Sequence, residues 1–150
     1  MIRALLAVTL AAALLAASLP AVESAAADRT AASLDREVDR IERGGASLLA
    51  EEDVGARRVV SVSLPAASLA GAGVDSFALG CGQRCSVSYT LSTGAARTRR
   101  LDVPLATPEG TIRFATPGVH RLSLRLIDGD DRSDEAATND DAGPVVAVSG

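Results

Sequence analysis

Two cysteines and one histidine are the side chains in this sequence with the most specific chemistry. Cys81 and Cys85 lie in the segment Cys-Gly-Gln-Arg-Cys, and in an oxidising compartment a disulfide between them is the default expectation. A reduced pair, or a pair with redox or metal chemistry, is the alternative. The redox motif has a two-residue spacer, which this segment exceeds. A zinc site needs four ligands, and His120 is the only histidine available to join the pair.

The sequence contains no catalytic motif. His120 lies on the same side of a predicted strand as Leu122, Leu124 and Leu126, so we expect it to be a strand residue rather than a general base. The sequence lacks the Gly-x-Ser-x-Gly motif of hydrolases, the phosphate-binding glycine loop and the His-Glu-x-x-His motif. We therefore expect a protein that is not an enzyme, with no cofactor and no small-molecule substrate.

An acidic cluster near the C-terminus has some of the ligands of a calcium loop. Its aspartates are Asp128, Asp130, Asp131 and Asp134. Arg132 falls where an oxygen ligand is needed, and Gly129 comes too early for the central glycine. We therefore expect residues 128–150 to be an acidic, disordered tail, because they lack the apolar content that offsets ordering entropy. Residues 145–148 are a short apolar patch that would either add an edge strand or remain loose.

The basic residues do not form the stripe that nucleic-acid binding requires. The net charge is -4, and every basic residue is arginine, so nucleic acid is not an expected partner. Arg97, Arg99 and Arg100 form the one basic cluster in the sequence. An acidic partner, lipid head groups or the acidic tail of the same chain are the candidate contacts for this cluster.

The elements that would position these side chains begin with an apolar N-terminal segment, residues 1–27. Residues 4–22 carry no charge and, as a helix at about 1.5 Å per residue, would reach about 28 Å, close to the thickness of a bilayer core. A cleaved signal peptide has the same features, and residues 24–26 and 25–27 both fit its small-x-small cleavage rule. The segment is therefore either a membrane anchor or a signal, and both place the rest of the chain outside the cytoplasm.

Residues 28–53 have the pattern of an amphipathic helix. Apolar residues recur at intervals of four and three, so they form a seam along one face of a helix. Charged residues occupy most of the other positions. The seam consists of Leu34, Val38, Ile41 and Leu48. It would pack on the domain behind it or remain exposed as an interaction surface. Pro20 predicts a discontinuity between the two helical segments, and Gly44 and Gly45 predict a kink or a break.

Period-two alternation replaces the helical pattern in residues 54–127. The strand-like segments are residues 60–64, 74–79, 85–91, 97–105, 111–114 and 119–127. Short strands separated by glycine and proline turns predict a small antiparallel sheet, as a sandwich or half-barrel. The predicted fold class is therefore α+β: an apolar helix, an amphipathic helix and then this sheet.

The order of these elements resembles that of type IV pilins and pseudopilins. In those families an apolar N-terminal helix anchors the subunit and then packs in the filament core, and here residues 4–127 have the corresponding layout. The early glutamate of many mature pilins has no counterpart, since Glu23 follows the apolar run. This resemblance favours the anchor over the cleaved signal.

The chain is also similar to a family of small uncharacterised haloarchaeal exported proteins, thought to be encoded near pilus or secretion genes. The similarity rests on the apolar start, residues 57–65, residues 89–105 and residues 118–126. It implies a membrane-anchored accessory or structural component of a surface appendage or envelope secretion system, with the C-terminal domain outside. A secreted module that binds a protein or a cell-surface polymer is the alternative function.

Overall fold

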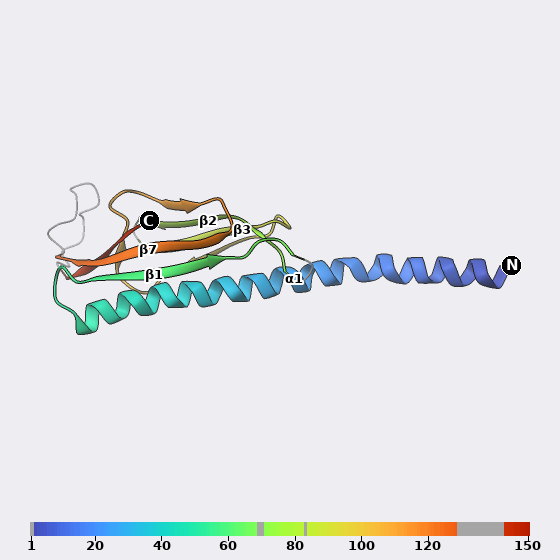
Figure 1. The fold of residues 1–150 in the computed structure, drawn as a ribbon, viewed down its shortest axis with the longest axis horizontal. Coiled ribbons are helices and arrows are strands. Elements are labelled where there is room, and N and C mark those ends of the chain that lie inside the picture. Colours follow the sequence, from blue (N-terminus) through green and yellow to red (C-terminus); the bar gives the residue numbers. More distant parts are fainter. Residues whose placement is uncertain (1, 69–70, 83, 129–142) are drawn as a thin grey trace.

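The protein has one long helix that carries a small β domain at its C-terminal half. The computed structural model describes residues 2–68, 71–82, 84–128 and 143–150. The helix α1 (Ile2–Glu51) has 50 residues and is therefore about 75 Å long at about 1.5 Å per residue. Its first half projects away from the β domain, and its second half lies along it (Figure 1).

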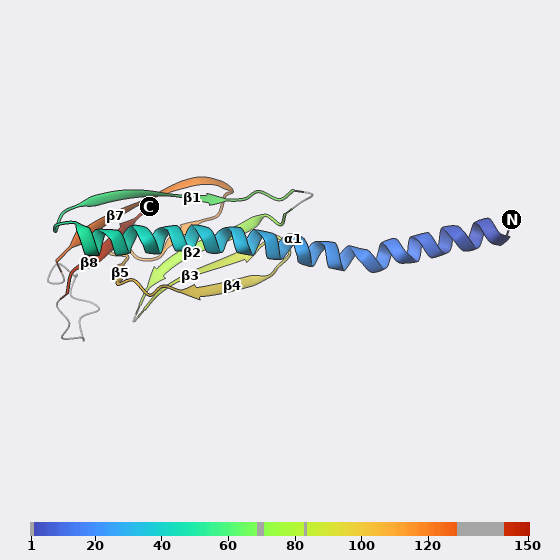
Figure 2. The ribbon, with the colours of Figure 1, turned by 90° about the horizontal axis from the view of Figure 1, so that it is seen from below.

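The helix is continuous through Pro20, so the predicted discontinuity is wrong. Proline lacks an N–H, which removes the hydrogen bond to the carbonyl four residues earlier. This part of α1 has no neighbouring element in the structure, so a bend there disturbs no packing. Figure 2 accordingly shows gentle curvature of the projecting half rather than a break.

Eight strands follow α1 in the described residues. The first four are β1 (Arg57–Leu64), β2 (Val74–Cys81), β3 (Cys85–Leu91) and β4 (Ala96–Arg100). The others are β5 (Leu105–Ala106), β6 (Ile112–Phe114), β7 (Gly118–Ile127) and β8 (Val145–Ser149). They form two four-stranded sheets with the orders β1-β7-β8-β5 and β4-β3-β2-β6. The α+β class is confirmed, and the strand pairs are antiparallel except for β5 with β8.

The C-terminal residues are the main departure from the predicted boundaries. Residues 145–149 form β8, which lies inside its sheet between β7 and β5. Val145, Val146 and Val148 are almost completely buried. The prediction of a tail from residue 128 onward is therefore wrong for these residues, while residues 129–142 lie outside the described residues. Burying three valines stabilises β8 by several kcal/mol, at about 1.5–3 kcal/mol each.

Gly44 and Gly45 do not break α1; they bring it close to the sheet. A Cβ atom at Gly44 would lie 3.0 Å from Val60 Cγ2, and one at Gly45 would lie 3.1 Å from Leu105 and Val103. These distances are shorter than ordinary van der Waals contact between carbon atoms. The cost of about 1 kcal/mol per helical glycine is offset by close packing of the helix against the domain.

Candidate functional site

The predicted seam lies in the core of this chain. Leu34, Val38 and Ile41 are fully buried, and Leu48 is 1% exposed. They pack in one cluster with side chains from both sheets, including Val62, Phe77 and Leu124. The seam therefore holds the second half of α1 to the β domain, and the alternative of an exposed interaction surface at these four residues is wrong.

Cys81 and Cys85 are joined by a disulfide. The two residues face each other at the end of the β2–β3 pair, where Cys81 is partly buried and Cys85 is buried. The bond fixes the connection between the strands, and Leu101 N–H donates to Cys85 O at 3.0 Å. Within the part of the chain that the structure describes, no three His, Cys, Asp or Glu side chains come together as metal ligands.

His120 lies near the start of β7 and contacts residues of the segment that precedes this strand. Its Nε2 atom is 2.8 Å from Thr116 O, and its ring stacks on Phe114 with the centroids 4.2 Å apart. These contacts match the expected role as a strand residue.

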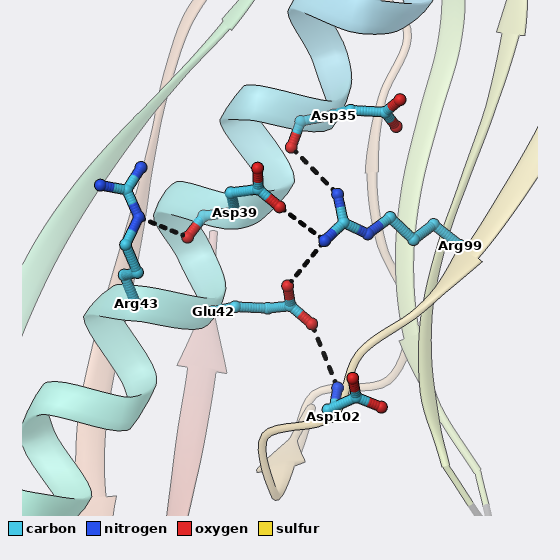
Figure 3. Close-up of polar contacts among 6 residues, drawn as sticks. All are labelled: Asp35, Asp39, Glu42, Arg43, Arg99 and Asp102. Carbon is cyan, nitrogen blue, oxygen red and sulfur yellow. Dashed lines mark hydrogen bonds and ion pairs between the residues drawn. The ribbon is translucent and has the colours of Figure 1, made fainter.

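Arg99 forms the most extensive polar cluster between α1 and the β domain (Figure 3). Its Nη2 atom lies 2.5 Å from Asp39 Oδ1 and 2.9 Å from Glu42 Oε2, while Nη1 donates to Asp35 O at 3.2 Å. Glu42 Oε1 also accepts from Asp102 N–H at 3.1 Å. The hydrogen bond to Asp39 and the charges of the nearby carboxylates raise the pKa of Arg99, so the guanidinium remains charged.

The predicted basic cluster is therefore divided. Arg97 pairs with Asp28 of α1 at 2.9 Å, and Arg99 pairs with Asp39 and Glu42. All three carboxylates belong to the helix of the same chain, so two of the three arginines serve to hold α1 on strand β4. Arg100 is exposed and forms no ion pair among the described residues.

A second basic surface arises where β1 and β7 pair, and the linear sequence does not show it. Arg57 lies directly opposite Arg125, and Ser61 lies opposite Arg121. All three arginines are exposed on the outer face of the sheet. Like charges directly opposite each other on a sheet are destabilising, so this arrangement costs some stability. Its only sequence signal is the even spacing of Arg121 and Arg125 within an alternating strand.

A groove runs beside this surface, between α1 and β1. It has a volume of about 310 Å³ and is lined by Arg40, Arg43, Gly44, Arg58, Val59, Val60 and Ser61. Arg40 Nη1 pairs with Glu37 Oε2 at 2.7 Å and lies 3.3 Å from Ser61 O. Arg43 Nε donates to Asp39 O at 3.1 Å. Arginines from the helix and the strand thus meet along one edge of the domain.

The projecting half of α1 is exposed and apolar. Leu5 and Leu15 are 68% exposed, and Leu10, Leu14 and Leu19 are 60% or more exposed. Among the described residues, α1 is the helix long and apolar enough to cross a membrane. An apolar surface of this size is uncommon on a soluble protein and marks contact with a membrane or with another protein. Together with the disulfide, it indicates a membrane-anchored or exported protein.

Comparison with known proteins places this architecture in a family. No curated protein and no solved structure matches the chain. The family described as "Domain of unknown function (DUF7311)" matches residues 1–137, which include α1 and the strands up to β7. The chain therefore belongs to the DUF7311 family.

Proposed function

We propose that this protein is a membrane-anchored accessory or structural subunit of a surface appendage or envelope secretion machine. It has no catalytic role in this proposal. The projecting half of α1 lies in the membrane, and the β domain lies outside the cytoplasm. A haloarchaeal source and an association with pili remain predictions from the resemblance of the sequence.

The observation that carries the proposal is the continuity of α1. Residues 2–22 are exposed and, at about 1.5 Å per residue, extend about 31 Å, enough to cross a bilayer core of about 30 Å. The same helix then enters the β domain without a break, and its buried residues begin at Thr30. One rigid element thus joins an apolar segment to a folded domain, as in the pilin layout that the sequence resembles.

The contacts between α1 and the β domain begin at the predicted cleavage positions. Thr30 Oγ1 lies 2.8 Å from Ala72 O, and Ala72 N–H donates to Ala26 O at 3.5 Å. Ala26 and Ala27, the two predicted cleavage positions, are partly buried. Cleavage after either residue would remove the contact of Ala26 and leave Thr30 on the domain, so the support for the anchor is the continuity of α1.

Subcellular fractionation with intact-mass spectrometry tests the location. We expect the full-length mass in the membrane fraction, resistant to alkaline extraction. If the medium instead contains a chain whose mass corresponds to an N-terminus after Ala26 or Ala27, the anchor is excluded and the secreted binding module is favoured. Accessibility of the β domain to protease in intact cells tests the orientation.

A matched pair of variants at one exposed position tests the role of the helix. Leu14→Arg places a charge near the middle of the apolar half, at a cost of about 2.5–3.5 kcal/mol in a bilayer, whereas Leu14→Ala stays apolar. We expect loss of membrane retention in the first variant and its preservation in the second. Equal retention of both would contradict membrane insertion.

Association with a machine is tested separately from insertion. Crosslinking in intact cells, followed by purification of the full-length chain from detergent, should recover subunits of a pilus or secretion complex. The Leu14→Arg variant is the control, because its β domain is unchanged but its anchor is lost. If the full-length chain is recovered alone after crosslinking, or with the same proteins as the Leu14→Arg variant, the accessory-subunit role is wrong even where insertion is confirmed.

A further inference from the structure

We infer that the end of the β domain nearest the projecting half of α1 lies against the head-group layer of a phospholipid membrane. This end, here called the neutral end, consists of the β1–β2, β3–β4 and β6–β7 turns. Their described residues are 65–68, 71–73, 92–95 and 115–117. The inference rests on the proposed membrane anchor and adds a second membrane contact to it.

Strand pairing gathers these three turns at one end of the domain. The β1–β2 turn begins after Leu64 and the β6–β7 turn ends at Gly118, and these two residues are paired. The β3–β4 turn begins after Leu91, which is paired with Val74 where the β1–β2 turn ends. All three turns lie at the end of the domain from which the N-terminal half of α1 projects (Figures 1 and 2).

Contacts with α1 place the neutral end close to the apolar half of the helix. Ala72 N–H donates to Ala26 O at 3.5 Å, and Thr30 Oγ1 lies 2.8 Å from Ala72 O. The uncharged run ends at Val22, so about 6 Å of helix separates it from Ala26, at about 1.5 Å per residue. The head-group layer on each side of a bilayer core is about 5–7 Å thick. When residues 2–22 span the core, the neutral end therefore meets this layer.

The composition of the three turns suits that position. Although 23% of the sequence is charged, the described residues of the turns are Pro, Ala, Ser, Gly and Thr only. A charged group beside a bilayer core loses part of its hydration, which costs free energy, whereas small and hydroxyl side chains lose less. Ala66, Thr93 and Thr116 are exposed, so the neutral residues form the surface of this end.

The opposite end of the domain is charged. Its charged residues include Glu52, Asp53, Arg57, Arg84, Asp102 and Asp128. The acidic residues 129–142 connect Asp128 to Gly143 at this same end, because Ile127 is paired with Val145. A segment of that length fixed at both ends reaches at most about 26 Å, whereas the 10 residues of β7 extend about 33 Å. The difference in charge between the two ends therefore holds for the whole chain.

The charged side chains nearest the neutral end indicate which lipid it fits. Asp28 and Arg97 form an ion pair of 2.9 Å and neutralise each other. Glu23, Arg29 and Asp75 are exposed near this end, so carboxylates outnumber arginines there among the described residues. An anionic lipid would be repelled by this excess, and a zwitterionic lipid such as phosphatidylcholine fits better.

The experiment uses tryptophan fluorescence, because the chain has no tryptophan of its own. The full chain is reconstituted into phosphatidylcholine vesicles that contain a lipid with a nitroxide on its head group, which quenches nearby emission. Thr93→Trp and Thr116→Trp place the reporter in two turns of the neutral end, where both positions are exposed. We expect loss of emission in both variants.

Val54→Trp is the matched control at the opposite end of the domain, where Val54 is 56% exposed. The 8 residues of β1 separate the two ends by about 27 Å, at roughly 3.4 Å per residue. This variant should therefore keep its emission.

A lengthened helix separates the geometry of the domain from the affinity of tryptophan for membranes. Insertion of about seven polar, helix-forming residues between Glu23 and Ser24 moves the domain away by about 10 Å with little rotation. Thr93→Trp should keep its emission in this chain, because the helix holds the turn above the head groups.

Leu14→Trp, with the nitroxide at the centre of the acyl chains, reports insertion of α1 separately. If Leu14→Trp is not quenched, the anchor and the inference fail together. If it is quenched while Thr93→Trp and Thr116→Trp keep their emission, the inference alone is wrong, and the neutral end faces solvent or another protein. Equal quenching of Val54→Trp, or quenching of Thr93→Trp that persists in the lengthened chain, would also overturn the inference.

Discussion

Arg99 on β4 and Glu42 on α1 form an ion pair of 2.9 Å that ties an edge strand of one sheet to the helix. Glu42 is 18% exposed at its side chain, and its second oxygen accepts from Asp102 N–H at 3.1 Å. Asp39, one turn earlier on α1, pairs with the same guanidinium at 2.5 Å. The seam attaches α1 by apolar packing, and Arg99 fixes its position against β4.

Arg99→Gln should lower the free energy of unfolding by about 1 kcal/mol, the upper end for a partly exposed ion-pair network. The reason is that two carboxylates on α1 lose their partner at once. Arg97→Gln is the matched control, because its pair with Asp28 is exposed and should contribute less than about 0.5 kcal/mol. Chemical denaturation in detergent measures both, and an equal effect of the two variants would contradict the role of the cluster.

Gly45→Leu should destabilise the protein by about 2 kcal/mol, because overpacking outweighs the gain of about 1 kcal/mol in helix propensity. A Cβ at this position already lies 3.1 Å from Leu105 Cδ2 and Val103 Cγ1. Ala46→Leu introduces the same side chain at the next position, which is exposed, and should change stability by less than about 0.5 kcal/mol. If Gly45→Leu is as stable as Ala46→Leu, α1 does not pack as closely as described.

Reduction of the Cys81–Cys85 disulfide should lower stability by about 2 kcal/mol, the entropic value for so short a loop. Thermal unfolding with and without dithiothreitol measures the difference. The variant with both cysteines replaced by alanine is the control and should not respond to the reductant. Alkylation of either cysteine in the unreduced native protein would show that the bond does not form.

Stability should decrease at alkaline pH because of Tyr89. Burial of the phenol, and to a smaller extent the negative charge of Asp35, raises the pKa of Tyr89 above the ordinary value of 10.0. Folding therefore favours the neutral phenol, so the full contribution is present below about pH 10 and is lost as pH rises from there through the higher pKa of the folded state.

The composition makes this titration easy to isolate. Tyr89 is the only tyrosine and the sequence has no lysine, so few other groups titrate in the same range. Ultraviolet absorbance should show a tyrosinate transition above about pH 10 in the folded protein. Tyr89→Phe should be less sensitive to pH in chemical denaturation between about pH 9 and about pH 11. A native transition at or below the ordinary tyrosine value would refute the effect of burial.

Local patterns in the sequence were sufficient to predict most elements. The alternation in residues 60–64 and in residues 85–91 predicted β1 and β3. The spacing of the seam predicted the second half of α1. These features depend on the side-chain period of a single helix or strand, which neighbouring residues determine.

The same patterns failed where a distant contact was decisive. Gly44 and Gly45 weaken a helix locally, yet α1 continues through both. At the glycines, close packing with Val60 and Leu105 compensates for the low propensity. The apolar residues of β8 gain their stabilisation only when β7 and β5 lie on either side of them.

The sequence by itself determined the apolar helix, the β-rich domain and the absence of recognisable catalytic motifs. Only the tertiary structure decided which residues share a surface. It buried the seam, divided Arg97 and Arg99 from Arg100 by pairing them with α1, and brought Arg57 opposite Arg125. Period and propensity act over a few neighbouring residues, whereas strand register joins residues far apart in the chain and thereby creates the charged surfaces.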